Sequence, residues 1–170
     1  TKNASLLQDD GVRFNQTIEA LSKLNPIFDR LSGTVTAGNS SQVSDGACSL
    51  IVCTESKAKE LNLEPLGFIK DYAYAGVDAH RMGLGPIYAT KKLFDKTGVS
   101  LKDMDLIELN EAFAAQVIAN IKAFSSDEFC KKTFNSSAIG EIDESILNVN
   151  GGAIALGHPV GMSGARIVLS

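Results

Sequence analysis

The 170-residue sequence has no tryptophan and few residues of the kinds that bind structural zinc. These scattered residues are His80, His158, Cys48, Cys53 and Cys130. A structural zinc site needs about four such ligands in close spacing, and no Cys-x-x-Cys pair is present, so we expect no metal site. The cysteine count is odd and the first residues lack a secretion signal. We therefore expect reduced thiols and a cytoplasmic protein.

The sequence also lacks a long apolar run and an excess of basic residues. No stretch approaches the ~18–20 apolar residues of a membrane span. Lys plus Arg is 16 and Asp plus Glu is 20, which gives a net charge of −4 and argues against a nucleic-acid partner. Hydrophobic residues make up 44% and charged residues 21%, as in ordinary globular proteins. The sequence does not start with Met, and we expect it to be an excerpt of a longer protein.

Apolar runs alternate with amphipathic stretches along the chain, which predicts an α/β layered fold. Buried or half-buried strands are expected at residues 47–53, 68–74, 106–109 and 147–149. Helices are expected at residues 18–27, 55–61, 86–97 and 113–124. Pro86 suits a first helical turn, Gly98 suits a helix end, and Ser100 with Asp103 indicates a capped turn. The polar segment 125–145 is predicted to be irregular.

The densest chemical signal is the glycine-rich segment 150–166, NGGAIALGHPVGMSGAR. Gly152 and Gly157 have the spacing of a phosphate-binding loop, but His158 and Pro159 follow where that loop needs Lys and Ser or Thr. Two interpretations remain open. In the first, the glycines only form a tight turn in which His158 is hydrogen-bonded. In the second, they clear space for substrate beside a catalytic His158. Histidine suits a general base or a donor to a developing oxyanion.

A second signal is Asn110, which follows the expected strand 106–109. Polar residues at strand carboxyl ends often contact ligands in α/β sheets, and an Asn there can hold a water or a carbonyl. The simpler alternative is that Asn110 caps the next helix. Gly83 and Gly85 resemble the start of a dinucleotide fingerprint, but Tyr88 stands where a small residue is needed, so we discount that interpretation.

Four motifs in order carry a resemblance to the thiolases. They are GTVTAGNSSQVSDG at 33–46, MGLGP at 82–86, ELNEAFAAQ at 108–116 and NVNGGAIALGHPVGMSGAR at 148–166. The resemblance implies a thiolase-like layered fold of two βαβαβ halves, of which this chain holds part. It implies the end of a loop domain at 1–44, a closing piece of the N-terminal domain at 45–64, and an incomplete C-terminal domain at 65–170.

The resemblance also implies a reaction, the reversible Claisen condensation between acyl-CoA thioesters. In thiolases a Cys thiolate becomes acylated and a second Cys moves the proton during carbon–carbon bond formation or cleavage. His158 matches the histidine that activates the nucleophile and helps bind the thioester oxygen. Asn110 matches the residue that positions a water in the oxyanion hole. Coenzyme A is part of the substrate here, so no separate cofactor is expected.

The contacts to CoA and substrate are carried over in the same way, to Ser41, Ala37, Phe28, Met82 and Phe113. For Met82 and Phe113 the alternative of ordinary core residues stays open. Chain-length preference and the direction of the reaction, synthesis or β-oxidative cleavage, are also open.

Neither catalytic Cys of the thiolases has a match among the three cysteines of this sequence. We therefore expect the 170 residues alone to be inactive and the longer enzyme to be a homo-oligomeric acyltransferase. One alternative is a truncated thiolase-like module that binds CoA or a partner without catalysis. Another is a ketoacyl synthase of the same fold, although the NEAFA and GHP motifs fit thiolases better.

Overall fold

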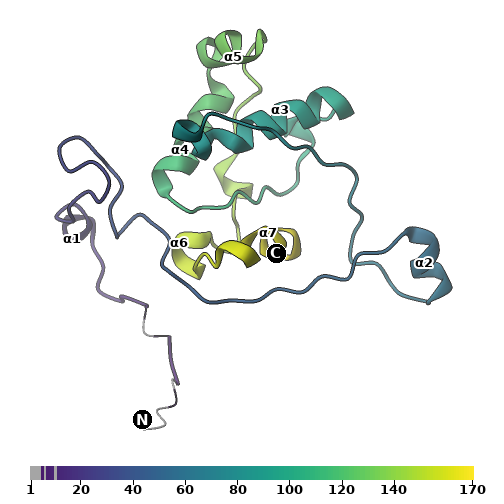
Figure 1. Cartoon of the computed structure of the whole chain (residues 1–170), viewed down its shortest axis with the longest axis horizontal. Coiled ribbons are helices and arrows are strands. Elements are labelled where there is room, and N and C mark those ends of the chain that lie inside the picture. The colour runs from purple at the N-terminus through teal and green to yellow at the C-terminus, as the bar shows by residue number, and fades with distance from the viewer. Residues whose placement is uncertain (1–4, 6, 10) are drawn as a thin grey trace.

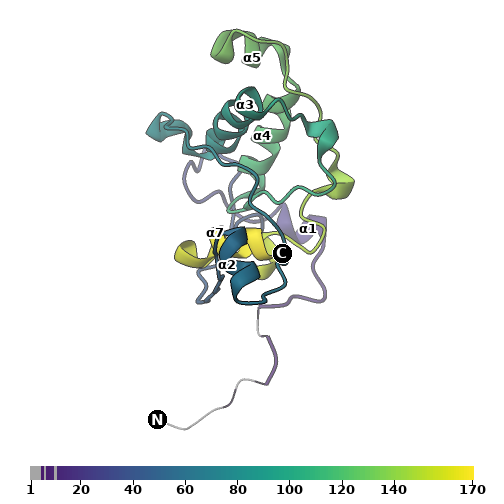
Figure 2. The same ribbon diagram turned by 90° about the vertical axis from the view of Figure 1, so that its right-hand side faces the viewer.

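The computed structural model describes residues 5, 7–9 and 11–170. The α-helices that follow residue 84 form two groups, one above the other in Figures 1 and 2. The first group is α3 (Gly85–Thr97), α4 (Ala114–Ser125) and α5 (Asp127–Phe134). The second is α6 (Ala153–Leu156) and α7 (Val160–Leu169). Short 3-10 helices span Ala79–Leu84, Leu101–Asp103 and Glu144–Ile146. The predicted segment 1–44 includes residues 1–4, 6 and 10, which lie outside the described part.

Helix α3 confirms the prediction for residues 86–97. Pro86 lies in its first turn, where the missing N–H costs nothing. Gly98 ends the helix in the left-handed region with φ 74°, and its N–H donates to the Phe94 carbonyl at 2.8 Å. The capped turn that follows is also confirmed. Ser100 and Asp103 form a reciprocal capping box, and the hydroxyl and backbone N–H of Ser100 hold the pKa of Asp103 below its usual value.

Helix α5 corrects the prediction that residues 125–145 are irregular. Ser126 caps it by accepting from the Phe129 N–H at 3.1 Å, and Asn135 ends it with φ 55°. Phe129 and Phe134 pack edge-to-face on Tyr88 of α3, with ring centroids 6.4 and 5.2 Å away. The helix is short and mostly polar, so tertiary packing of two aromatic rings decides it.

The buried core lies among α3, α4 and the chain that returns from α5. It contains Ile87, Ala123, Phe124 and Ile142. The largest polar side chain within it is Asn120, which is fully buried. Helix α4 confirms the helix expected at 113–124, and Val117 and Phe124 on it are buried.

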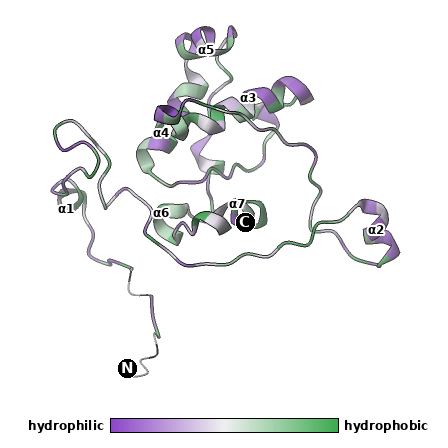
Figure 3. Cartoon of the chain, viewed as in Figure 1, coloured by the Kyte–Doolittle hydropathy of each residue, from purple (hydrophilic) through white to green (hydrophobic). Residues whose placement is uncertain are grey.

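The two helices near the N-terminal half lie on long extended segments (Figure 1). α2 (Glu55–Glu60) confirms the prediction for 55–61. Figure 3 shows that α2 is largely hydrophilic, whereas α7 is largely hydrophobic. α1 (Ile18–Leu21) is much shorter than the predicted 18–27. Pro26 disfavours helical geometry in the residue before it, which helps to explain the early end.

The expected strands are not formed among the described residues, where only isolated β-bridges occur. The prediction of a buried strand at 47–53 is wrong, because Ile51 and Val52 are 90% and 72% exposed. Phe68 and Tyr72 of the expected strand 68–74 are exposed too. A strand requires a neighbour for its backbone hydrogen bonds, and these extended runs find none within the described chain. The layered sheet arrangement therefore stays a prediction.

Candidate active site

The two motifs singled out in the sequence are joined by a short parallel pairing. Ile107 and Leu147 form a β-bridge whose two backbone hydrogen bonds are each 2.9 Å. The Asn148 side chain then extends this pairing. Its Oδ1 accepts from the Leu109 N–H at 2.8 Å and its Nδ2 donates to the Leu109 carbonyl at 2.9 Å. The amide thus replaces a peptide group and fixes the backbone just before Asn110.

Glu111 joins the motifs a second time, beneath Gly152. A Cβ on Gly152 would lie 2.1 Å from Oε2 of Glu111, so the carboxylate occupies the space of a side chain. The same oxygen accepts a long hydrogen bond of 3.4 Å from the Ile154 N–H. Sequence reasoning gave Glu111 no role. The glycine pair at 151–152 indicated that some group approaches the backbone closely there. The sequence did not show that this group is Glu111.

The loop 33–46 holds the histidine turn from the other side. Gly157 has φ 93°, and a Cβ there would lie 2.6 Å from the Oγ of Ser44. That Oγ accepts from the His158 N–H at 3.3 Å. Three residues earlier the loop pairs with the segment just before α4, since the Ser41 N–H donates to the Ala112 carbonyl at 2.9 Å. The loop therefore bridges both motifs.

His158 and Asn110 meet directly. Nε2 of His158 is 3.4 Å from Nδ2 of Asn110, and Nδ1 is 2.6 Å from Oγ of Ser163 in α7. The Oδ1 of Asn110 is buried and has no hydrogen-bond partner in the described part of the chain. The alternative that Asn110 caps the next helix is wrong, because the N-cap position of α4 is Phe113.

A cavity of about 970 Å³ opens beside this contact. Its lining includes five of the seven predicted site residues: Phe28, Met82, Asn110, Phe113 and His158. Met82 is 73% exposed, so the alternative that it is a core residue is wrong. The Phe28 and Phe113 rings pack edge-to-face with centroids 5.9 Å apart.

The other two predicted contacts, Ser41 and Ala37, lie in the loop 33–46 outside the cavity lining. His80 is exposed but contributes to the lining. The position of His80 on the 3-10 helix beside Met82 accounts for this, and the sequence offered no signal for it.

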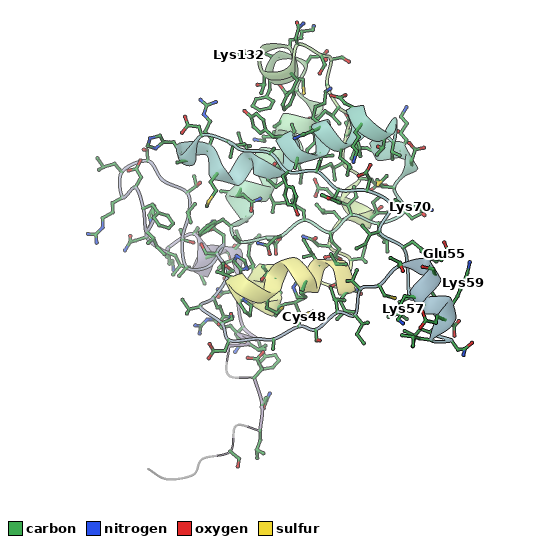
Figure 4. The ribbon with its side chains drawn as sticks, turned by 45° about the vertical axis from the view of Figure 1, so that its right-hand side comes forward. Cys48, Glu55, Lys57, Lys59, Lys70 and Lys132 are labelled. Atoms are coloured by element: carbon green, nitrogen blue, oxygen red, sulfur yellow. The ribbon has the colours of Figure 1, made fainter. Side chains whose placement is uncertain are left out.

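None of the three cysteines lines this cavity. Cys130 is buried, and its Sγ donates to the Ala123 carbonyl at 3.5 Å. Cys53 is exposed. Cys48 is half-buried on the extended segment that passes beside α7 (Figure 4), in a second hollow of about 360 Å³ next to Pro159.

Among residues 5, 7–9 and 11–170, no three His, Cys, Asp or Glu side chains are close enough to share a metal ion. In the same part of the chain, no helix combines the length and the apolar character needed to span a membrane.

Two family models match the chain. The thiolase N-terminal domain matches residues 1–56 and the thiolase C-terminal domain matches residues 63–170. The chain belongs to the thiolase family. This confirms the resemblance drawn from the four motifs. It also supports a thiolase-like fold.

Individual thiolases agree with the family models. A 3-ketoacyl-CoA thiolase of Yersinia enterocolitica is 47% identical over 166 residues, which cover 96% of this chain and 38% of that protein. The crystal structure of human mitochondrial 3-ketoacyl-CoA thiolase in complex with CoA is 44% identical with a TM-score of 0.78, covering 98% of this chain and 38% of its own.

The dimeric peroxisomal thiolase of Saccharomyces cerevisiae is 42% identical with a TM-score of 0.71, covering 94% of this chain and 37% of its own. The chain thus spans about 38% of the length of the thiolases that it matches.

Proposed function

We propose that the full-length thiolase containing this chain transfers acyl groups between CoA thioesters by a reversible Claisen condensation. The observation that carries the proposal is the contact between His158 and Asn110 at the edge of a cavity lined by Phe28 and Met82. The relative in Yersinia enterocolitica is a 3-ketoacyl-CoA thiolase, and the human structure contains CoA. Both support a CoA thioester as the substrate.

In the cleavage direction, a cysteine thiolate bonds to the ketone carbon and the adjacent carbon–carbon bond breaks. The acetyl-CoA enolate takes up a proton, and the acyl group then passes from sulfur to a second CoA. In this proposal His158 takes the proton of the attacking thiol and faces the negative oxygen that develops. Asn110 contributes through its Oδ1, which is buried without a partner and therefore suited to fix a water. Donors held in fixed positions around an oxygen that becomes negative in the transition state stabilise that charge and lower the activation barrier.

We further propose that the 170 residues alone do not catalyse this reaction. A nucleophile must lie within hydrogen-bond reach of its base, and none of Cys48, Cys53 and Cys130 lines the cavity that contains His158. The alternative of a non-catalytic CoA-binding module is less well supported. Such a module has no need for an asparagine held against a histidine.

The test is thiolysis of acetoacetyl-CoA by the full-length protein, in which the acetyl-CoA formed is measured. We expect His158→Ala to lower kcat by ~10²–10⁴-fold, the usual contribution of general acid–base help. Asn110→Ala should also lower kcat, whereas its matched control Asn15→Ala, at an exposed position, should not. A His158→Ala enzyme with kcat within twofold of wild type would contradict the proposal. CoA binding by calorimetry without any turnover would favour the non-catalytic module instead.

The assembly of the full-length protein stays a prediction. The yeast relative is dimeric, which supports a homo-oligomer here. Sedimentation of the full-length protein would show it, and a monomer at assay concentrations would contradict it. Cytoplasmic location also stays a prediction.

A further inference from the structure

We infer that Ser163 is a positioning residue that sets the proton arrangement of the His158 ring, an inference that rests on the proposed function. Ser163 lies in the first turns of α7 and is only 2% exposed. Its Oγ lies 2.6 Å from Nδ1 of His158. It is thus the side chain that holds the ring nitrogen opposite the one facing Asn110.

The direction of the hydrogen bonds follows from the partners of Ser163. Its hydroxyl has a single proton, which it donates to the Pro159 carbonyl at 3.1 Å, an oxygen that can only accept. With that proton on the carbonyl, the same Oγ accepts from His158, and we therefore assign the ring proton to Nδ1.

The opposite nitrogen, Nε2, then has the free lone pair. It faces the Nδ2 of Asn110 at 3.4 Å, a group that can only donate. All four groups fit one chain of donors and acceptors, from Asn110 through His158 and Ser163 to Pro159. In a neutral histidine the bond made by one nitrogen decides which nitrogen is basic. Ser163 therefore presents Nε2 to the cavity as the base.

Replacing Ser163 by alanine has a matched control in α4. The hydroxyl of Ser125 lies 3.4 Å from the Ile121 carbonyl and 3.3 Å from the Lys122 carbonyl, so it bonds back to its own helix as Ser163 does to Pro159. Ser125 is exposed and bonds no ring. A Ser→Ala change at 125 thus removes a helix hydroxyl without touching a histidine, and it separates a general effect on a helix from an effect on His158.

The experiment compares Ser163→Ala, Ser163→Thr and Ser125→Ala in the full-length protein. One readout is thiolysis of acetoacetyl-CoA. We expect Ser163→Ala to lower kcat by about 2- to 12-fold, the ratio for loss of a neutral hydrogen bond of ~0.5–1.5 kcal/mol. KM should stay within twofold. Ser163→Thr keeps the hydroxyl and should restore kcat, and Ser125→Ala should match wild type.

The second readout is the ¹⁵N NMR spectrum of labelled histidine, with His158 assigned by its loss in His158→Gln. Wild type and Ser163→Thr should show the proton on Nδ1, and Ser163→Ala should show a mixture. A wild-type ring protonated on Nε2 would overturn the inference, because Ser163 would then donate to Nδ1. An unchanged tautomer in a folded Ser163→Ala protein would also overturn it.

The two readouts separate the inference from the function on which it rests. If wild type shows no thiolysis, the proposed function fails, while the NMR result still decides whether Ser163 sets the ring. If Ser163→Ala does not fold, the folded Ser163→Thr variant decides: loss of the Nδ1 proton there overturns the inference.

Discussion

Replacing Asn120 by alanine should uncouple the start of α3 from α4. Asn120 is fully buried, and its side chain makes three hydrogen bonds. Nδ2 donates to the Gly83 carbonyl at 2.7 Å and to the Gln116 carbonyl at 2.9 Å. Oδ1 accepts from the Ile87 N–H at 3.3 Å, one of the amides at the helix start that has no partner within its own helix.

The magnitude follows from the groups left behind. The Gln116 carbonyl lies inside α4 and belongs to its ladder of backbone bonds, so its loss should cost little. The Gly83 carbonyl and the Ile87 N–H would each lose a partner in a buried setting, at ~1–3 kcal/mol for each unsatisfied group. Partial access of water to the Gly83 side favours the lower end. We therefore expect Asn120→Ala to lower the free energy of unfolding by about 2–4 kcal/mol.

The assay is urea unfolding of the full-length protein, together with hydrogen exchange of the peptide that contains Ile87. Faster exchange at Ile87 would locate the loss at the start of α3. Asn15→Ala, at an exposed position, is the matched control and should change neither measurement. If Asn120→Ala unfolded at the wild-type urea concentration with unchanged exchange at Ile87, the account of these hydrogen bonds would be wrong.

Two further predictions concern the contact beneath Gly152 and the capping box. Gly152→Ala places a Cβ 2.1 Å from Oε2 of Glu111 and should lower kcat by displacing the His158 loop; Gly161→Ala, where a Cβ meets open space, is its control in the thiolysis assay. Wild-type kcat in Gly152→Ala would contradict this. Because the pKa of Asp103 is lowered in the folded state, its contribution to stability is present above its unfolded pKa of ~3.9 and is lost as the pH falls through the folded value. The urea midpoints of wild type and Asp103→Asn should therefore differ at pH 6 and converge in acid; a constant difference would contradict the assignment.

The parts of the fold that could be predicted are those fixed by neighbouring residues. Pro86 and Gly98 bound α3 because each acts on its own backbone, through a missing N–H and a positive φ. The capping box of Ser100 and Asp103 is equally local. Helix α5 was missed because its stability depends on rings packed against Tyr88, some 40 residues earlier in the chain.

The extended runs show the same limit for strands. Residues 47–53 and 68–74 have the composition of strands, and a pattern of β-branched and aromatic residues indicates only that a segment suits a pleated surface. Whether it becomes a strand depends on a partner. The described residues supply no partner strand for these runs. The chain spans about 38% of the length of its relatives.

The site divides along the same line. His158 and Asn110 were found from their motifs, but three of the groups that hold the motifs were not. Asn148, Glu111 and Ser44 each act across a long sequence separation. Asn148 is the clearest case. The sequence predicts that it lies in a strand at 147–149, whereas its φ of 49° is a left-handed value that asparagine tolerates. Only the fold shows that its amide pairs with Leu109, 39 residues away. A single bridge at Ile107 fixes the register weakly, so the two side-chain bonds of Asn148 carry the pairing to the residue before Asn110. The position of Asn110 thus depends on a second asparagine, Asn148, whose long-range role its motif does not reveal.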